Sequence, residues 1–286
     1  MSRKSLLFSC TALAGCLVLG GAAHAAQALD FRQAVQLGKQ AYEGNPAAYT
    51  QLKASAQAGS AAAESVLGAL YQAGSPAVNK DDAAAFKWLR QAAEQGDAEA
   101  QFGLGVMVAN GRGTAQDYAA AARWFVKAAE QGNPAPYFYL GLLYENGLGV
   151  AKNYAEAAKW YAKAAATPGP VGLQFDLATG GAKELRPPED SSQVIKDFPM
   201  VPDQAQAGAA YNLGMMSWNG RGAAANSVEA YKWFVVASAR GSRLADYNLR
   251  NLARGMSQKQ ISDATAQATA WEAEHPFNGA GKSPSR

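Results

Sequence analysis

Cysteine and histidine are nearly absent from this sequence. The 286 residues include two cysteines, Cys10 and Cys16, and two histidines, His24 and His275. Cys10, Cys16 and His24 all lie close to the N-terminus. A chain that loses this beginning has no disulfide, no thiol nucleophile and no thiolate ligand for a metal. A Ser–His–Asp or Cys–His catalytic group would then have to use His275.

The first 25 residues have the features of a signal peptide. Two basic residues precede an apolar run, residues 6–19, which is too short to span a bilayer. A small-x-small tripeptide ends at Ala25, and we predict cleavage there, with residues 26–286 periplasmic or secreted. The alternative is a lipoprotein anchored to the membrane, because Leu-Ala-Gly-Cys ending at Cys16 matches a bacterial lipobox.

Excess charge of either sign is also lacking. The formal net charge is +3, and it falls to +1 when Arg3 and Lys4 are removed with the signal peptide. A nearly neutral chain has no electrostatic footprint for nucleic acid. The sequence contains no His-Glu-x-x-His, Gly-x-Ser-x-Gly or Ser-x-x-Lys motif. We therefore predict no catalytic residue, no metal and no cofactor.

One pattern occurs four times along the chain. Leu-Gly pairs end at Gly68, Gly105, Gly141 and Gly214, at intervals of 37, 36 and 73 residues, and the last interval is two periods. Tryptophans keep the same spacing, at Trp88, Trp124, Trp160 and Trp233. Two independent markers with one period indicate a solenoid of stacked units.

Each unit has the pattern of two helices. In the second helix apolar residues, the four tryptophans among them, recur at i, i+3, i+4 and i+7, which places them on one face, so we assign the tryptophans to packing. Short polar residues that can cap this helix precede it at Asp117, Asn153 and Asn226. The glycines of the Leu-Gly pairs lie inside the first helix, where glycine costs about 1 kcal/mol against alanine. We expect the neighbouring helix to approach closely at these glycines.

The repeated unit closely resembles the Sel1-like repeat, a relative of the tetratricopeptide repeat. The shared marks are Leu-Gly-x-Leu/Met-Tyr, an Asn-Gly-x-Gly loop, Ala-x-x-Trp and a Lys-Ala-Ala-x-x-Gly ending. Clear copies cover residues 60–169, as three repeats, and residues 207–241 as a fourth. The resemblance implies an all-α fold, a right-handed α/α superhelical solenoid of helical hairpins whose first helices line the concave wall.

Weaker segments flank the clear copies. Residues 26–59 read as a degenerate N-terminal repeat, and residues 242–275 as a partial repeat followed by a capping helix from Ser257 to Glu274. We expect the Gly/Ser/Pro-rich tail, residues 276–286, to be disordered.

Residues 170–206 interrupt the period. Six of the twelve prolines lie between 167 and 206, where no tryptophan occurs. An eroded repeat and an inserted loop both remain open. Apolar residues alternate from Val171 to Leu177 with strand-like spacing. This face either packs on the adjacent repeat or forms an arm that contacts a partner, with Phe175 as the candidate contact.

Three Gly-x-Gly pieces, residues 111–113, 147–149 and 220–222, have the look of phosphate loops. They recur with the repeat period, connect two helices and follow no strand, so we interpret them as turns.

Aromatic and arginine side chains are strong anchors at protein interfaces. We therefore select the aromatic residues of first helices that depart from or decorate the repeat pattern, and the arginines of the loops, as candidate partner contacts. They are Tyr137, Tyr139, Tyr211, Trp218, Arg112 and Arg221.

A solenoid without catalytic groups presents a large grooved surface that suits a protein partner. The resemblance implies an adaptor, and we predict a periplasmic scaffold that binds a component of an envelope complex, with membrane contact only if Cys16 is lipidated. The first alternative is an immunity protein that neutralises a secreted phospholipase-type toxin, as some proteins of this repeat type do. The second is a hydrolase. Cysteine-rich family members said to act on β-lactams have a disulfide in each repeat, which this chain lacks.

Overall fold

The computed structural model describes residues 29–167 and 202–276. The predicted signal peptide, the tail and Phe175 lie outside these residues. The described part contains twelve helices and no strand, apart from an isolated bridge between Ser75 and Val78. The helices are α1 (Phe31–Tyr42), α2 (Pro46–Gln57), α3 (Ala61–Ala73), α4 (Asp82–Glu94), α5 (Ala98–Asn110), α6 (Tyr118–Glu130), α7 (Ala135–Asn146), α8 (Tyr154–Ala166), α10 (Pro202–Asn219), α11 (Ser227–Ala239), α12 (Arg243–Ala253) and α13 (Gln258–Glu274).

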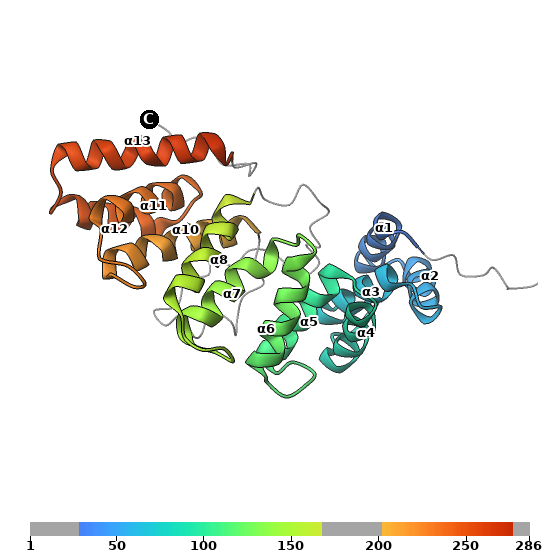
Figure 1. The fold of residues 1–286 in the computed structure, drawn as a ribbon. Coiled ribbons are helices and arrows are strands. Elements are labelled where there is room, and N and C mark those ends of the chain that lie inside the picture. The colour runs from blue at the N-terminus through green and yellow to red at the C-terminus, as the bar shows by residue number, and fades with distance from the viewer. Residues whose placement is uncertain (1–28, 168–201, 277–286) are drawn as a thin grey trace, which may run out of the picture.

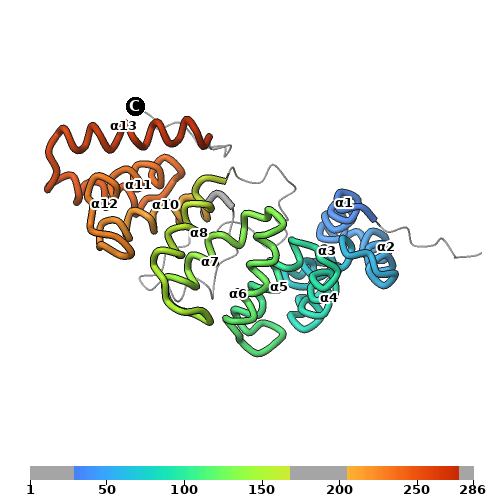
Figure 2. Tube along the Cα trace, in the orientation of Figure 1, coloured from blue at the N-terminus to red at the C-terminus, as the bar shows by residue number. Residues whose placement is uncertain are grey.

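Consecutive helices pair into hairpins, and the hairpins stack in a curved row (Figure 1). The pairs are α1–α2, α3–α4, α5–α6, α7–α8 and α10–α11. The second helix of one hairpin packs against the first helix of the next, as in α4 with α5, α6 with α7 and α8 with α10. The Cα trace runs from α1 at one end of the stack to α13 at the other end (Figure 2). The prediction of an all-α solenoid is confirmed.

First helices of neighbouring hairpins also touch one another, α3 with α5 and α7 with α10. Helices on the inside of a curved stack lie closer together than those on the outside. These contacts therefore agree with an inner wall formed by first helices.

The glycine inside each first helix makes room for one large side chain of its own hairpin. A Cβ atom at Gly105 would lie 2.6 Å from Cε1 of Phe125, and one at Gly141 would lie 2.5 Å from the Tyr161 ring. The other two hairpins have the same relation, with Leu89 over Gly68 and Phe234 over Gly214. The close approach expected at these glycines is confirmed, and it explains why a poor helix former stands there.

The residue that fills this gap follows the tryptophan of the repeat. Leu89, Phe125, Tyr161 and Phe234 are all buried. The tryptophans pack against the core from its edge, and only Trp233 is itself buried. Lysine side chains lie over all four, with Nζ 4.4 Å from the centre of the Trp124 ring, 4.3 Å from Trp160, 4.5 Å from Trp233 and 5.8 Å from Trp88. The tryptophans pack against the core, as predicted. The residue that fills the centre of each hairpin, however, is the one that follows the tryptophan in the sequence.

The predicted caps occupy the helix ends. Asp117, Asn153 and Asn226 each accept hydrogen bonds from backbone N–H groups in the first turn of the second helix. Exposed amides at helix starts are satisfied in this way.

The hairpin α10–α11 stacks directly on α7–α8. Helix α10 contacts both α8 and α7. The Gln206 side-chain amide donates a hydrogen bond to the carbonyl oxygen of Thr167 at the end of α8. Helices α8 and α10 therefore pack directly on one another, and residues 168–201, for which an eroded repeat and an inserted loop were the alternatives, lie outside the described residues.

Candidate interaction surface

Each Asn-Gly-x-Gly loop connects the two helices of one hairpin and packs against the preceding hairpin. The first glycine, for example Gly111 with φ +66°, ends the first helix in the left-handed conformation. The second glycine meets the start of the preceding hairpin's second helix. A Cβ atom at Gly113 would lie 2.2 Å from the Asp82 carbonyl oxygen, and one at Gly149 would lie 2.3 Å from the carbonyl carbon of Tyr118. These loops are turns, as interpreted, and they join one repeat to the next.

Arg112 strengthens the first of these connections. Its Nη2 donates to Oδ1 of Asp82 at 2.6 Å and its Nε donates to Oδ2 at 3.2 Å. Hydrogen bonding to Arg112 holds the pKa of the Asp82 carboxyl below its ordinary value, against a smaller opposing effect of burial. The guanidinium thus has an internal partner, and a third of its side chain stays exposed.

Arg221 makes an ion pair with a buried carboxylate. Its Nη1 donates to Oε1 of Glu145 at 3.0 Å, and the Tyr161 hydroxyl donates to Oε2 of the same carboxylate at 2.7 Å. The Glu145 side chain is 8% exposed, whereas that of Arg221 is 45% exposed. Burial, followed by the negative charge of Glu145, raises the pKa of Tyr161 well above its ordinary value. This group joins the loop of the fourth repeat to the third.

Sequence reasoning missed the glutamines that close the hairpins. The Gln95 amide donates to Glu64 at 2.6 Å, and the Gln131 amide donates to Gln101 at 2.7 Å. Each bond joins the C-cap residue of a second helix to the fourth residue of its own first helix. The signal was present, because Ala-Ala-Glu-Gln-Gly occurs twice at the repeat period.

The prediction that Tyr139 contacts a partner is wrong. Its side chain is 1% exposed. The ring packs between two other rings, with centroids 5.4 Å from Phe102 and 5.3 Å from Phe125. Its burial raises the pKa of the hydroxyl above its ordinary value. Tyr139 therefore belongs to the core that joins the second and third repeats.

Three predicted contact residues are half-buried on first helices. Tyr137 lies 5.8 Å from Trp160 between ring centroids, and Lys163 lies over both rings. Tyr211 and Trp218 both pack on Phe234, at 5.7 and 5.9 Å. Part of each of these three aromatic side chains remains exposed.

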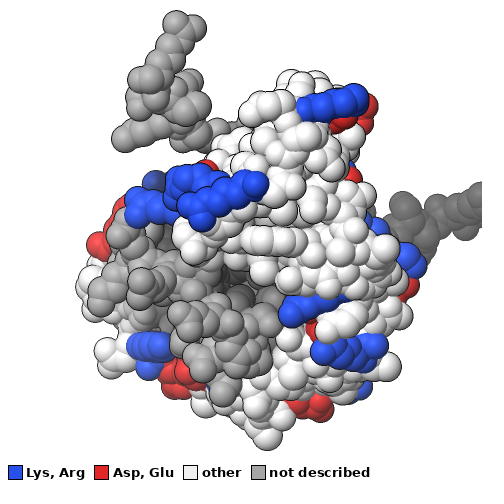
Figure 3. Space-filling view, turned by 90° about the vertical axis from the view of Figure 1, so that its left-hand side faces the viewer, with Lys and Arg blue, Asp and Glu red and all other residues white. Residues whose placement is uncertain are grey.

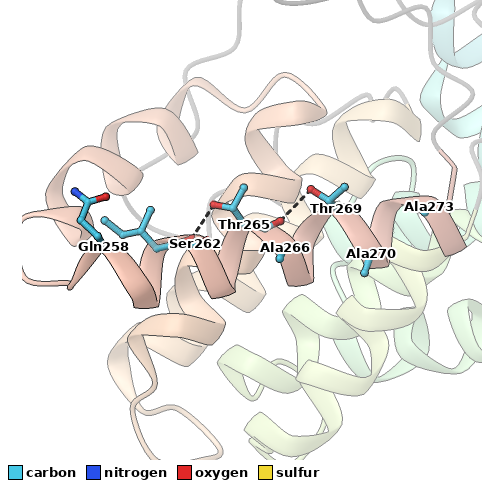
Figure 4. A pocket seen from close by; sticks show the side chains of 8 residues that line it. Gln258, Ser262, Thr265, Ala266, Thr269, Ala270 and Ala273 are labelled. Atoms are coloured by element: carbon cyan, nitrogen blue, oxygen red, sulfur yellow. Dashed lines mark hydrogen bonds between the residues drawn. The ribbon is translucent and has the colours of Figure 1, made fainter.

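A shallow hollow follows the outward face of α13 (Figure 4). Its lining side chains are uncharged and extend from Gln258 to Ala273 on one helix. The hydroxyls of Thr265 and Thr269 donate to backbone oxygens one turn earlier, at 2.8 and 3.0 Å. The hollow therefore offers no side chain for acid–base chemistry.

Residues 29–167 and 202–276 contain no group of three His, Cys, Asp or Glu side chains that could hold a metal ion. Within the same ranges, no helix combines the length and the apolar character needed to cross a membrane.

Comparison with known proteins gives the family. The Sel1 repeat model matches residues 61–97, 98–133, 137–166 and 207–242. No curated protein matches the chain. Among solved structures, a Sel1 repeat protein from Oxalobacter formigenes is 24% identical with a TM-score of 0.58, over 87% of this chain and 86% of that one. A protective antigen of uropathogenic Escherichia coli strains with this type of fold is 26% identical with a TM-score of 0.48, over 86% of this chain and 53% of that one.

The matched ranges coincide with the hairpins α3–α4, α5–α6, α7–α8 and α10–α11. The likeness to the Oxalobacter protein shows the fold. Sequence period, hairpin geometry and family match agree, and the chain belongs to the Sel1 repeat family.

Proposed function

We propose that this chain is an exported scaffold of the periplasm that binds a protein partner through the wall formed by its first helices. Sel1 repeat proteins generally mediate protein–protein interaction, and their fold is typically a non-catalytic scaffold. The features of residues 1–25 support export.

The proposal depends on one observation: the arginine side chains of the loops bind carboxylates of the preceding hairpin. Arg112 bonds to Asp82, and Arg221 bonds to Glu145, each across a boundary between hairpins. Such bonds, with the close loop glycines, fix one hairpin against the next. A fixed stack has little ordering entropy to lose when a partner binds. The surface of the stack then serves recognition.

The half-buried aromatic residues of first helices are the proposed anchors. Tyr137, Tyr211 and Trp218 each have one side against the core, which fixes the ring before a partner arrives. Rigid aromatic side chains of this kind often dominate the binding energy of an interface.

The test is a pull-down from periplasmic extract with tagged residues 26–286, followed by mass spectrometry. We expect a specific partner to be retained, and retention to fall about tenfold for Tyr137→Ser, as for an interface anchor. Tyr231→Ser, a half-buried tyrosine on the second helix α11, is the matched control and should retain the partner.

Three outcomes of this experiment distinguish the scaffold from the immunity protein and the hydrolase. A secreted toxin as the retained partner would favour the immunity alternative. An envelope component would favour the scaffold. If nothing is retained while the purified protein hydrolyses substrates from a panel, the proposal is wrong.

A further inference from the structure

In the part of the chain that the structure describes, helix α12 begins a hairpin that has no second helix of its own. Leu249 follows Leu213 by 36 residues, so α12 is in register with α10. Helix α12 packs against α11, as other first helices pack against the preceding second helix. The next helix, α13, packs against α11 as well. The face of α12 that its own second helix would cover is therefore open.

The register identifies that face by residue. Three residues before the repeat glycine, a ring of the first helix packs on a ring of its own second helix. The centroid distances are 5.9 Å for Phe102–Phe125, 5.7 Å for Phe138–Tyr161 and 5.7 Å for Tyr211–Phe234. The corresponding residue in α12 is Tyr247, which is 60% exposed, beside Leu244 at 36%. These two are the exposed large hydrophobic residues of the described chain.

Arginines take the other positions of this face. Arg250 stands where the repeats have glycine, and Arg254 stands where the fourth repeat has Trp218 on Phe234. Both arginines are exposed, and in the described part of the chain neither has a hydrogen-bond or ion-pair partner. Figure 3 shows this end of the stack, where basic side chains form several patches on a largely uncharged surface.

We propose that the open face of α12 binds an acidic amphipathic helix of another protein, which takes the place of the missing second helix. A helix is the occupant because the same face is covered by a helix in four preceding hairpins. Apolar residues on one side of the incoming helix would cover Tyr247 and Leu244. Its carboxylates would pair with Arg250 and Arg254, and arginine binds carboxylates in a two-pronged geometry.

This site deepens the proposed interaction function and rests on it, but it lies on α12 at the end of the stack, whereas the proposed wall anchors lie on α7 and α10. Helix-in-groove recognition needs apolar anchors at helical spacing, and Leu244 and Tyr247 lie on neighbouring turns. Tyrosine and arginine are also the residue types that most often dominate an interface. Charge complementarity then selects an acidic helix over a basic one.

The experiment uses a phage-displayed library of helix-forming peptides, about 16 residues long, randomised along one face and selected against residues 26–286. We expect enriched peptides to combine Asp or Glu with aromatic or aliphatic residues. Synthetic versions should bind about tenfold more weakly to Arg250→Glu/Arg254→Glu and to Tyr247→Ala, as measured by fluorescence anisotropy. Binding should also weaken with salt. Arg123→Glu, which reverses an exposed arginine on α6, is the matched control and should bind normally.

A charge swap provides a second check. Replacing the peptide's acidic residues by lysine should abolish binding to the natural chain and restore it to Arg250→Glu/Arg254→Glu. Peptides that bind all variants equally would overturn the α12 site and leave the interaction function standing. A library without enrichment would overturn the site as well. Self-association of the natural chain that Tyr247→Ala abolishes, seen by sedimentation, would assign this face to a second copy instead.

Discussion

Arg112 and Asp82 are joined by hydrogen bonds of 2.6 and 3.2 Å, although they belong to different hairpins. The bond connects a loop of the second repeat to the first turn of α4. Gly113 in the same loop lies against the backbone carbonyl of Asp82. The arginine and the glycine therefore both contact Asp82 and together hold the loop against the start of α4.

Replacing Arg112 by alanine should lower the free energy of unfolding by about 0.5–1 kcal/mol at pH 7, because the pair is partly exposed. The pKa of Asp82 lies below its ordinary 3.8 in the folded chain. The pair therefore stabilises the fold above that pH and loses its effect as the pH falls through the lowered pKa. Urea unfolding of both proteins at several pH values should show the difference shrinking in acid. A difference that grows in acid would contradict the assignment.

Two glycines of α5 should respond to alanine in opposite ways. At Gly105 a Cβ would lie 2.6 Å from the Phe125 ring, so Gly105→Ala should cost about 1–3 kcal/mol. At Gly103 the nearest atom is 3.4 Å away, so Gly103→Ala should gain up to about 1 kcal/mol from helix propensity. Thermal unfolding of the two variants provides the comparison. Equal effects of the two changes would exclude the close crossing at Gly105.

Arg221→Ala should destabilise the chain by about 1–3 kcal/mol, because the buried Glu145 loses its cationic partner. Adding Glu145→Gln in the same chain should recover part of the loss, since a neutral amide needs no counter-charge. A double-mutant cycle measured by urea unfolding gives the coupling between the two residues. Additive effects would show that the pair is not coupled.

Arg240 should hold α13 to the stack. Its Nη1 donates to the Ala165 carbonyl at 2.6 Å, its Nη2 donates to the His275 carbonyl at 3.2 Å, and its guanidinium carbon lies 4.9 Å from the Trp271 ring. Arg240→Ala should cost about 2–3 kcal/mol and speed amide hydrogen exchange in α13 more than in α5. Arg254→Ala, at an exposed arginine of the same end, should leave exchange in α13 unchanged.

The repeating architecture was predictable from the sequence because each unit contains the same residues that determine how its two helices pack. Glycine in the first helix, an apolar stripe in the second and a polar cap between them appear in every clear copy. Trp124 and Phe125 show the limit of this reasoning, since neighbours in a helix share one broad face and periodicity does not rank them. The crossing at Gly105 decides that Phe125 enters the core.

The candidate site was less predictable, because its residues acquire partners through tertiary structure. Glu145 lies 76 residues before Arg221 in the chain, and a loop arginine looks the same in sequence whether it faces solvent or a buried carboxylate. Tyr139 was expected at the surface because it departs from the repeat pattern. It departs because it fills a space between Phe102 and Phe125, which composition does not reveal.

The hydrogen bond from Gln206 to Thr167 joins two residues that are 39 positions apart in the sequence. Since α10 packs directly on α8 and α7, these helix contacts set the spacing and rotation of the stack at this joint. A change in the length of residues 168–201 should therefore leave the stacking of α10 on α8 intact. The connection between α8 and α10 is thus a position at which a repeat protein can accept inserted sequence while the stacking of its helices is kept.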